Sequence, residues 1–156
     1  MKRLDTHDRA LALGILARAK DATLASIRGD GMPHASTVNF ANEELVIYAA
    51  IGIDSQKAHN IRLDPRVSLT VNAPYQDWSE IRAMSIDAAA EIISAPQQVR
   101  EASELLLARF PQYARFVADT GTVPWPGMLF IRIVPHAISL LDYTQGFGHT
   151  RHFVVN

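Results

Sequence analysis

The chain has 156 residues, of which 48% are hydrophobic and 20% charged, a composition typical of one globular domain with a full hydrophobic core. The formal net charge is −1, so no overall basic field favours nucleic acid or an anionic membrane, and any anion site must be local. Cysteine is absent, which excludes disulfides and thiolate chemistry. We find no signal-peptide core and no apolar run long enough to cross a bilayer, and we expect a cytoplasmic protein.

The first half of the chain alternates short strands with two helices. The pair Asp5-Thr6 offers an N-cap, the segment Gly29-Asp30-Gly31 is a hairpin turn that needs positive φ, and the pair Asp64-Pro65 ends a helix. In chain order we expect a helix over 5–20, strands over 22–28 and 33–40, a turn over 41–44, a strand over 45–50, a helix over 55–63 and a strand over 67–72.

The second half predicts longer strands. In chain order we expect a strand over 80–94, a helix over 96–109, a helical turn over 113–117, a loop over 119–127, strands over 128–134 and 137–141 around Pro135, and an edge strand over 153–155. About six strands in hairpin order with few helices indicate an antiparallel barrel or sandwich with helical insertions. Composition does not change along the chain, so residues 1–156 form a single domain.

The segment Ser55-Gln56-Lys57, at the start of the second helix, has two interpretations. Unpaired N–H groups and the positive end of the helix dipole create an anion site, to which Lys57 adds a charge suited to a phosphate. A serine before a polar first turn is also the ordinary N-cap, which the local pattern alone favours.

Other motifs carry less chemistry. No Ser-His-Asp order, nucleophile elbow or Walker loop supports a hydrolase or NTPase. The segment Gly146-Phe147-Gly148-His149 is either a glycine-rich turn between terminal strands or a site where His149 donates a proton. His149 and His152 have no acidic third ligand, so we expect no metal site.

Three ordered segments carry a resemblance to a known family. They are Gly31-Met32-Pro33-His34-Ala35-Ser36-Thr37-Val38, the strand from Leu45 to Ala50, and Ser55-Gln56-Lys57-x-x-Asn60-Ile61 followed by Asp64-Pro65-Arg66-Val67-Ser68-Leu69. This set resembles the pyridoxamine 5′-phosphate oxidase-like split-barrel flavoproteins over residues 20–95. The resemblance implies a mainly β, six-stranded antiparallel split β-barrel that binds FMN and works as a homodimer, with two flavins at the subunit interface.

The resemblance also implies which residues contact FMN. The strand 34–38 lays its backbone along the flavin ring, the end of the next strand borders the cofactor, and the helix start holds the phosphate. Trp78 either covers the ring or plugs a barrel end, and Arg82 is a candidate for a phosphate or ribityl contact. The cofactor-binding residues implied are His34, Ala35, Ser36, Thr37, Val38, Ala50, Ile51, Ser55, Gln56, Lys57, Trp78 and Arg82.

Two departures from the family pattern refine these expectations. The family often has arginine where Gln56 stands, so the phosphate site is one charge short, and Arg82 or a partner-chain residue is expected to compensate. The C-terminal tryptophan and arginine pattern of true pyridoxamine-phosphate oxidases is not evident, so we do not expect vitamin B6 oxidation.

Two functions follow from the resemblance. The first is an FMN-dependent oxidoreductase that passes hydride or electrons to a small molecule, with no catalytic side chain identified. The second is a non-catalytic module that binds or stores flavin, deazaflavin or haem on the same barrel. In both cases the partners are small molecules and a second copy of the chain, without nucleic acid or membrane.

Overall fold

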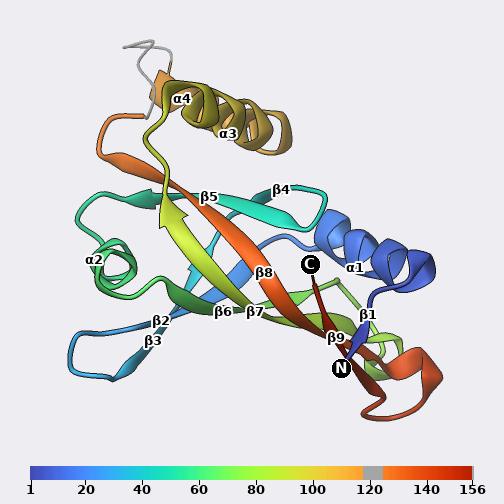
Figure 1. The fold of residues 1–156 in the computed structure, drawn as a ribbon. Coiled ribbons are helices and arrows are strands. Elements are labelled where there is room, and N and C mark those ends of the chain that lie inside the picture. Colours follow the sequence, from blue (N-terminus) through green and yellow to red (C-terminus); the bar gives the residue numbers. More distant parts are fainter. Residues whose placement is uncertain (118–124, 156) are drawn as a thin grey trace.

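A sheet of nine strands wraps around the core in the computed structural model, which describes residues 1–117 and 125–155 (Figure 1). The strands are β1 (Lys2–Arg3), β2 (Ala22–Ile27), β3 (Pro33–Val38), β4 (Ala41–Glu43), β5 (Val46–Gly52), β6 (Arg66–Asn72), β7 (Arg82–Ile92), β8 (Met128–Asp142) and β9 (Thr150–Val154). The helices are α1 (Thr6–Arg18), α2 (Gln56–Leu63), α3 (Pro96–Arg109) and α4 (Ala114–Val117), with 3-10 turns η1 (Trp78–Glu80), η2 (Pro111–Tyr113) and η3 (Tyr143–Gln145). The expected mainly β fold with helical insertions is confirmed.

The order of the strands leaves an opening in the barrel. The main path through the sheet runs β1-β9-β8-β7-β6-β2-β3, and β5 pairs with β8 beside it. Strand β3 therefore ends the path and forms a ladder with β2 alone. It comes into contact with β5, but no ladder joins the two strands. We call this junction between β3 and β5 the split.

Three details of the sheet correct the expectations. The described residues contain nine strands where about six were expected. Among the additions are β1 and β4; the latter lies in the turn expected over 41–44 and pairs with β5 around Glu44 at φ 51°. Strand β8 is continuous through Pro135, which has no backbone N–H to donate to the ladder. A bulge accommodates the proline, because the register with β7 shifts between Asp87 and Ala88. Strand β1 runs parallel to β9, so the sheet is mixed rather than wholly antiparallel.

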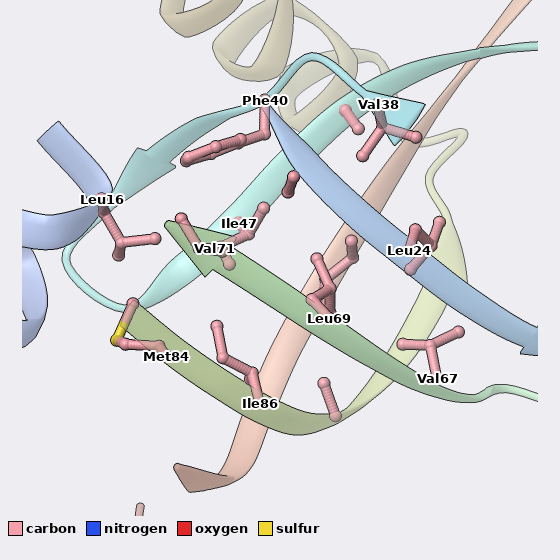
Figure 2. Close-up of a cluster of buried hydrophobic side chains, with 14 of the residues drawn as sticks. Leu16, Leu24, Val38, Phe40, Ile47, Val67, Leu69, Val71, Met84 and Ile86 are labelled. Carbon is pink, nitrogen blue, oxygen red and sulfur yellow. The ribbon is translucent and has the colours of Figure 1, made fainter. Parts of the chain in front are cut away.

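Alternating apolar residues on the strands fill the barrel. Leu24, Leu69 and Ile86 lie on adjacent strands and are at most 1% exposed (Figure 2). Strands with one face on a core alternate in this way because successive side chains point to opposite faces. A second apolar cluster, which includes Leu106 and Trp125, lies beneath α3 and is separate from the barrel core.

Helices close the barrel at its edges. Helix α1 contacts β6 and β7, and an ion pair between its buried Asp8 and Arg151 of β9 ties it to the C-terminal strand. Helix α2 lies on the opposite side of the molecule from α1, against β2, β5 and β7 (Figure 1). The turn over residues 146–149 is confirmed, because the His149 N–H donates to the Gly146 carbonyl at 3.1 Å between β8 and β9. Residues 118–124 lie outside the described residues, and they include positions 119–124 of the loop expected over 119–127.

None of the helices in the described part of the chain has the length and apolar character needed to span a membrane.

Candidate functional site

The inner face of β3 presents two polar groups to the split. His34 and Ser36 stand opposite Ser26 and Leu24 of β2, both buried, so these four side chains share one face of the sheet. The His34 Nδ1 and Ser36 Oγ atoms are buried and have no hydrogen-bond partner within the described residues. Buried polar atoms are normally paired, so these two atoms mark a place where a ligand would supply the missing partners.

The outer residues of β3 belong to a different surface. Ala35 and Thr37 stand opposite Ala25 and Thr23 and face away from the core. A surface hollow of about 340 Å³ lies along β2 and β6, and its lining includes Ala25, Ser26 and Ser68. Neither His34 nor Ser36 lines it, so this hollow is distinct from the place marked by the two unpaired polar atoms.

The β5–α2 junction forms the other side of the split. Ile51, which is 1% exposed, belongs to the barrel core, whereas Ala50 lies on the opposite face of β5 and packs against the second cluster beneath α3. Ser55 is the N-cap of α2, where its hydroxyl accepts from the Ala58 N–H at 3.2 Å and donates to the Gly52 carbonyl at 2.7 Å. The ordinary cap and the anion site are thus compatible, since the cap satisfies only one of the free N–H groups at the helix start.

Positive charge at this junction is not neutralised. Lys57 lies in the first turn of α2, which contains no acidic residue, and it has no ion pair or hydrogen bond within residues 1–117 and 125–155. A cation beside the positive end of a helix dipole is unfavourable unless an anion joins it. Arg62 adds a second cation, because its Nη1 lies 3.5 Å from the Ile53 carbonyl oxygen in the loop before the cap. Asp54, which is exposed, is the acidic residue closest to the cap in sequence.

A polar chain connects α2 with the strand that carries His34. Gln56 donates through Nε2 to Asn60 Oδ1 at 2.7 Å, and Asn60 donates through Nδ2 to Ser26 Oγ at 3.0 Å. Asn60 is fully buried, and Ser26 is the cross-strand partner of His34. The chain therefore holds the helix start and the inner face of β3 in a fixed relation.

Two predicted residues lie at the far end of the barrel. Arg82 begins β7, whereas α2 approaches the other end of this strand, roughly 30 Å away along its length. Its guanidinium bonds Asp142 at 3.3 Å and Thr144 at 3.4 Å. Trp78 is 57% exposed and packs edge-on against Phe147, with ring centroids 5.5 Å apart. Within one chain neither residue reaches the split.

The pKa of Asp142, whose carboxylate binds Arg82, is lowered. Burial raises the pKa of Asp142, but hydrogen bonds from Thr144 and Arg82 outweigh it, so the pKa lies below its ordinary value. Asp142 stays ionised near neutral pH and holds Arg82 in place.

The structure thus divides the predicted residues into two groups. Those on β3, at the end of β5 and at the start of α2 are His34, Ser36, Val38, Ile51, Ser55, Gln56 and Lys57. Those away from the split are Ala35 and Thr37 on the outer face, Ala50 against the second cluster, and Trp78 and Arg82 at the far end. Sequence reasoning missed the roles of Ser26, Asn60 and Arg62. Helical spacing was the available signal for two of them. Asn60 lies four residues after Gln56, and Arg62 lies seven residues after Ser55.

Across the described ranges 1–117 and 125–155, no group of three or more His, Asp or Glu side chains is arranged to hold a metal ion.

Comparison with solved structures shows the same fold at low sequence identity. The haem binding protein from Mycobacterium smegmatis matches with a TM-score of 0.77 and 16% identity, over 99% of this chain and 60% of that protein. General Stress Protein 26 from Bacillus anthracis matches with a TM-score of 0.69 and 18% identity, over 96% of this chain and 100% of that protein. HutZ, the haem storage protein from Vibrio cholerae, matches with a TM-score of 0.67 and 16% identity, over 85% of this chain and 90% of that protein.

No curated protein sequence matches this chain significantly. A family model described as pyridoxamine 5′-phosphate oxidase matches residues 11–141, which include the split, α2 and nearly all of the barrel. This chain belongs to the pyridoxamine 5′-phosphate oxidase family.

Proposed function

We propose that this protein binds FMN in the split and acts as an FMN-dependent oxidoreductase on a small molecule. The observation that carries the proposal is the positive charge at the β5–α2 junction, where Lys57 stands unpaired beside a helix start without acidic residues. In a chain of this family, a phosphate is the anion that suits such a site.

Each part of the split has a separate task in this proposal. The free N–H groups of the first turn and Lys57 bind the phosphate, and the end of β5 at Ile51 borders the ring. His34 Nδ1 and Ser36 Oγ, which lack partners in the described structure, hydrogen-bond the polar rim of the flavin. The bound flavin would supply the chemistry by accepting and donating hydride or electrons.

We further propose that two copies associate through the outer face of the sheet. This face carries the hollow of about 340 Å³ and a second of about 220 Å³, and no helical residue lines either one. A broad strand surface of small side chains such as Ala25, Ser68 and Ser85 permits close approach of another sheet. Ala35 and Thr37 would lie at that interface, and the second copy would bring its own Trp78 and Arg82.

Haem binding is the second candidate, because two of the similar structures are haem proteins. Haem iron requires an axial ligand, and a histidine is the usual one. His34 is the histidine that lies at the split, half-buried with one unpartnered ring nitrogen. A haem propionate would occupy the positive site in place of the phosphate.

An absorption spectrum separates the two candidates. The purified protein is titrated with FMN and, in a separate sample, with haem, while flavin fluorescence and the Soret band are followed. FMN binding in the micromolar range and reduction of the bound flavin by a nicotinamide cofactor support the oxidoreductase. Haem binding that His34→Ala abolishes, without FMN binding, would replace it with a haem module.

A further inference from the structure

The phosphate site of the proposed function lacks the arginine that the family often has at the position of Gln56. Resting on that proposed function, we infer that Arg62 supplies the missing cation and selects FMN over the unphosphorylated flavin, riboflavin. Arg82 does not do so within one chain.

Gln56 itself is engaged elsewhere. Its side-chain amide donates to Asn60 at 2.7 Å, and Asn60 is bound in turn to Ser26 in the buried chain. Turning Gln56 toward a phosphate would leave the buried Asn60 oxygen without its donor, at a cost in stability. The residue at the family's arginine position therefore supports the helix, and the second charge must come from another side chain.

Arg82 is bound to other residues at the end of the barrel away from α2. It shares its guanidinium between Asp142 and Thr144, and about ten residues of β7 separate it from the strand end that α2 approaches. The ion pair with Asp142 also neutralises its charge.

Arg62 is placed to act at the junction. It follows Ser55 by seven residues, close to two helical turns, so both residues lie on one face of α2. Side chains on a helix lean toward its N-terminus, and the guanidinium reaches back to within 3.5 Å of the Ile53 carbonyl. This contact is at the limit of a hydrogen bond, and it is the one polar interaction of Arg62 within the described residues.

The resulting charges match a phosphate. Arg62 contacts the loop before the cap, Lys57 lies in the first turn of α2, and the exposed Asp54 directly precedes the cap residue in sequence. A phosphate monoester carries close to two negative charges at neutral pH, so one lysine and one arginine neutralise it. Riboflavin presents only a hydroxyl at that position and gains nothing from Arg62.

The test measures affinity for FMN and for riboflavin by quenching of flavin fluorescence. Arg62→Gln removes the charge but keeps an N–H donor for the Ile53 carbonyl, and Arg62→Lys keeps the charge. We expect Arg62→Gln to weaken FMN binding roughly ten- to a hundred-fold without changing riboflavin binding. Arg62→Lys should recover most of the loss. Arg100→Gln, which removes an exposed arginine from α3, serves as the matched control for net charge.

The outcomes are distinguishable. An unchanged FMN-to-riboflavin ratio in Arg62→Gln overturns the inference and leaves the proposed function standing. Equal losses for both flavins also overturn it, because they mark Arg62 as a support of the loop, and thermal unfolding of the variant checks that case. Wild-type protein that binds neither flavin refutes the proposed function itself.

Discussion

Substitution of Lys57 by glutamine tests the charge argument most directly. Glutamine has a helix propensity similar to that of lysine and an unbranched polar side chain, but it removes the cation. Lys57 has no ion pair within the described residues, so the folded protein loses no ionic contact when the charge is removed. A charge-assisted hydrogen bond contributes about 1.5–3 kcal/mol, so FMN affinity should fall roughly ten- to a hundred-fold. Because Lys57 is half-buried, solvent screening favours the lower end of that range.

The assay is fluorescence titration of FMN at low and at high salt, with Asp54→Asn as the matched variant. Removing the exposed acid before the cap should strengthen FMN binding by up to about five-fold, the scale of a surface charge interaction. High salt should reduce the effects of both substitutions. If Lys57→Gln binds FMN as well as the wild type at low salt, the phosphate does not lie at this helix start.

Three further predictions concern stability. Asn60→Ala should lower the free energy of unfolding by about 2–3 kcal/mol, because it breaks the buried chain to Ser26; exposed Asn72→Ala is the control, and equal urea midpoints would contradict the argument. Asp8→Asn should cost about 2–4 kcal/mol, since it leaves Arg151 without its counter-ion, and Asp8→Leu combined with Arg151→Met should recover part of this loss; a double variant less stable than Asp8→Leu alone would refute it. A hydrogen bond from the Arg66 side chain lowers the pKa of Asp64 to about 2, below its ordinary value of 3.8. The stability this gives is present above pH 4 and is lost as the pH falls toward 2, so Asp64→Asn should flatten that part of the urea-midpoint profile; parallel profiles would show that the pair contributes nothing.

The sequence predicted the elements that depend on local chemistry. The helix start at Ser55 followed from an ordinary cap, and Asp64-Pro65 ended that helix as expected, with Leu63 its last residue. The misjudged elements depended on partners distant in sequence. Residues 41–43 form a strand because β5 supplies their ladder, and β8 continues through Pro135 because a bulge absorbs the proline. Neither partner is visible in a short window of sequence.

The same limit explains the candidate site. Ser55, Gln56 and Lys57 were found because they are adjacent, whereas the buried bond from Asn60 to Ser26 crosses 34 residues of sequence. The resemblance also grouped Arg82 and Trp78 with these residues, since it places cofactor contacts from two subunits on one sequence. Register along β7 separates them within one chain, and the proposed association of two copies is what would bring the two groups together.

The proposed role of Arg62 would supply the second charge of the site without an arginine at the position of Gln56. An arginine there would place its charge at the first helical position, directly beside the phosphate site. Glutamine instead bonds Asn60 and stiffens the link between α2 and β2. The charge can then return from Arg62, because two helical turns bring position 62 under position 55 and the long side chain spans the rise between them. On this assignment the electrostatic requirement of the proposed site belongs to a helix face rather than to a run of adjacent residues, and a motif written as consecutive letters would miss it.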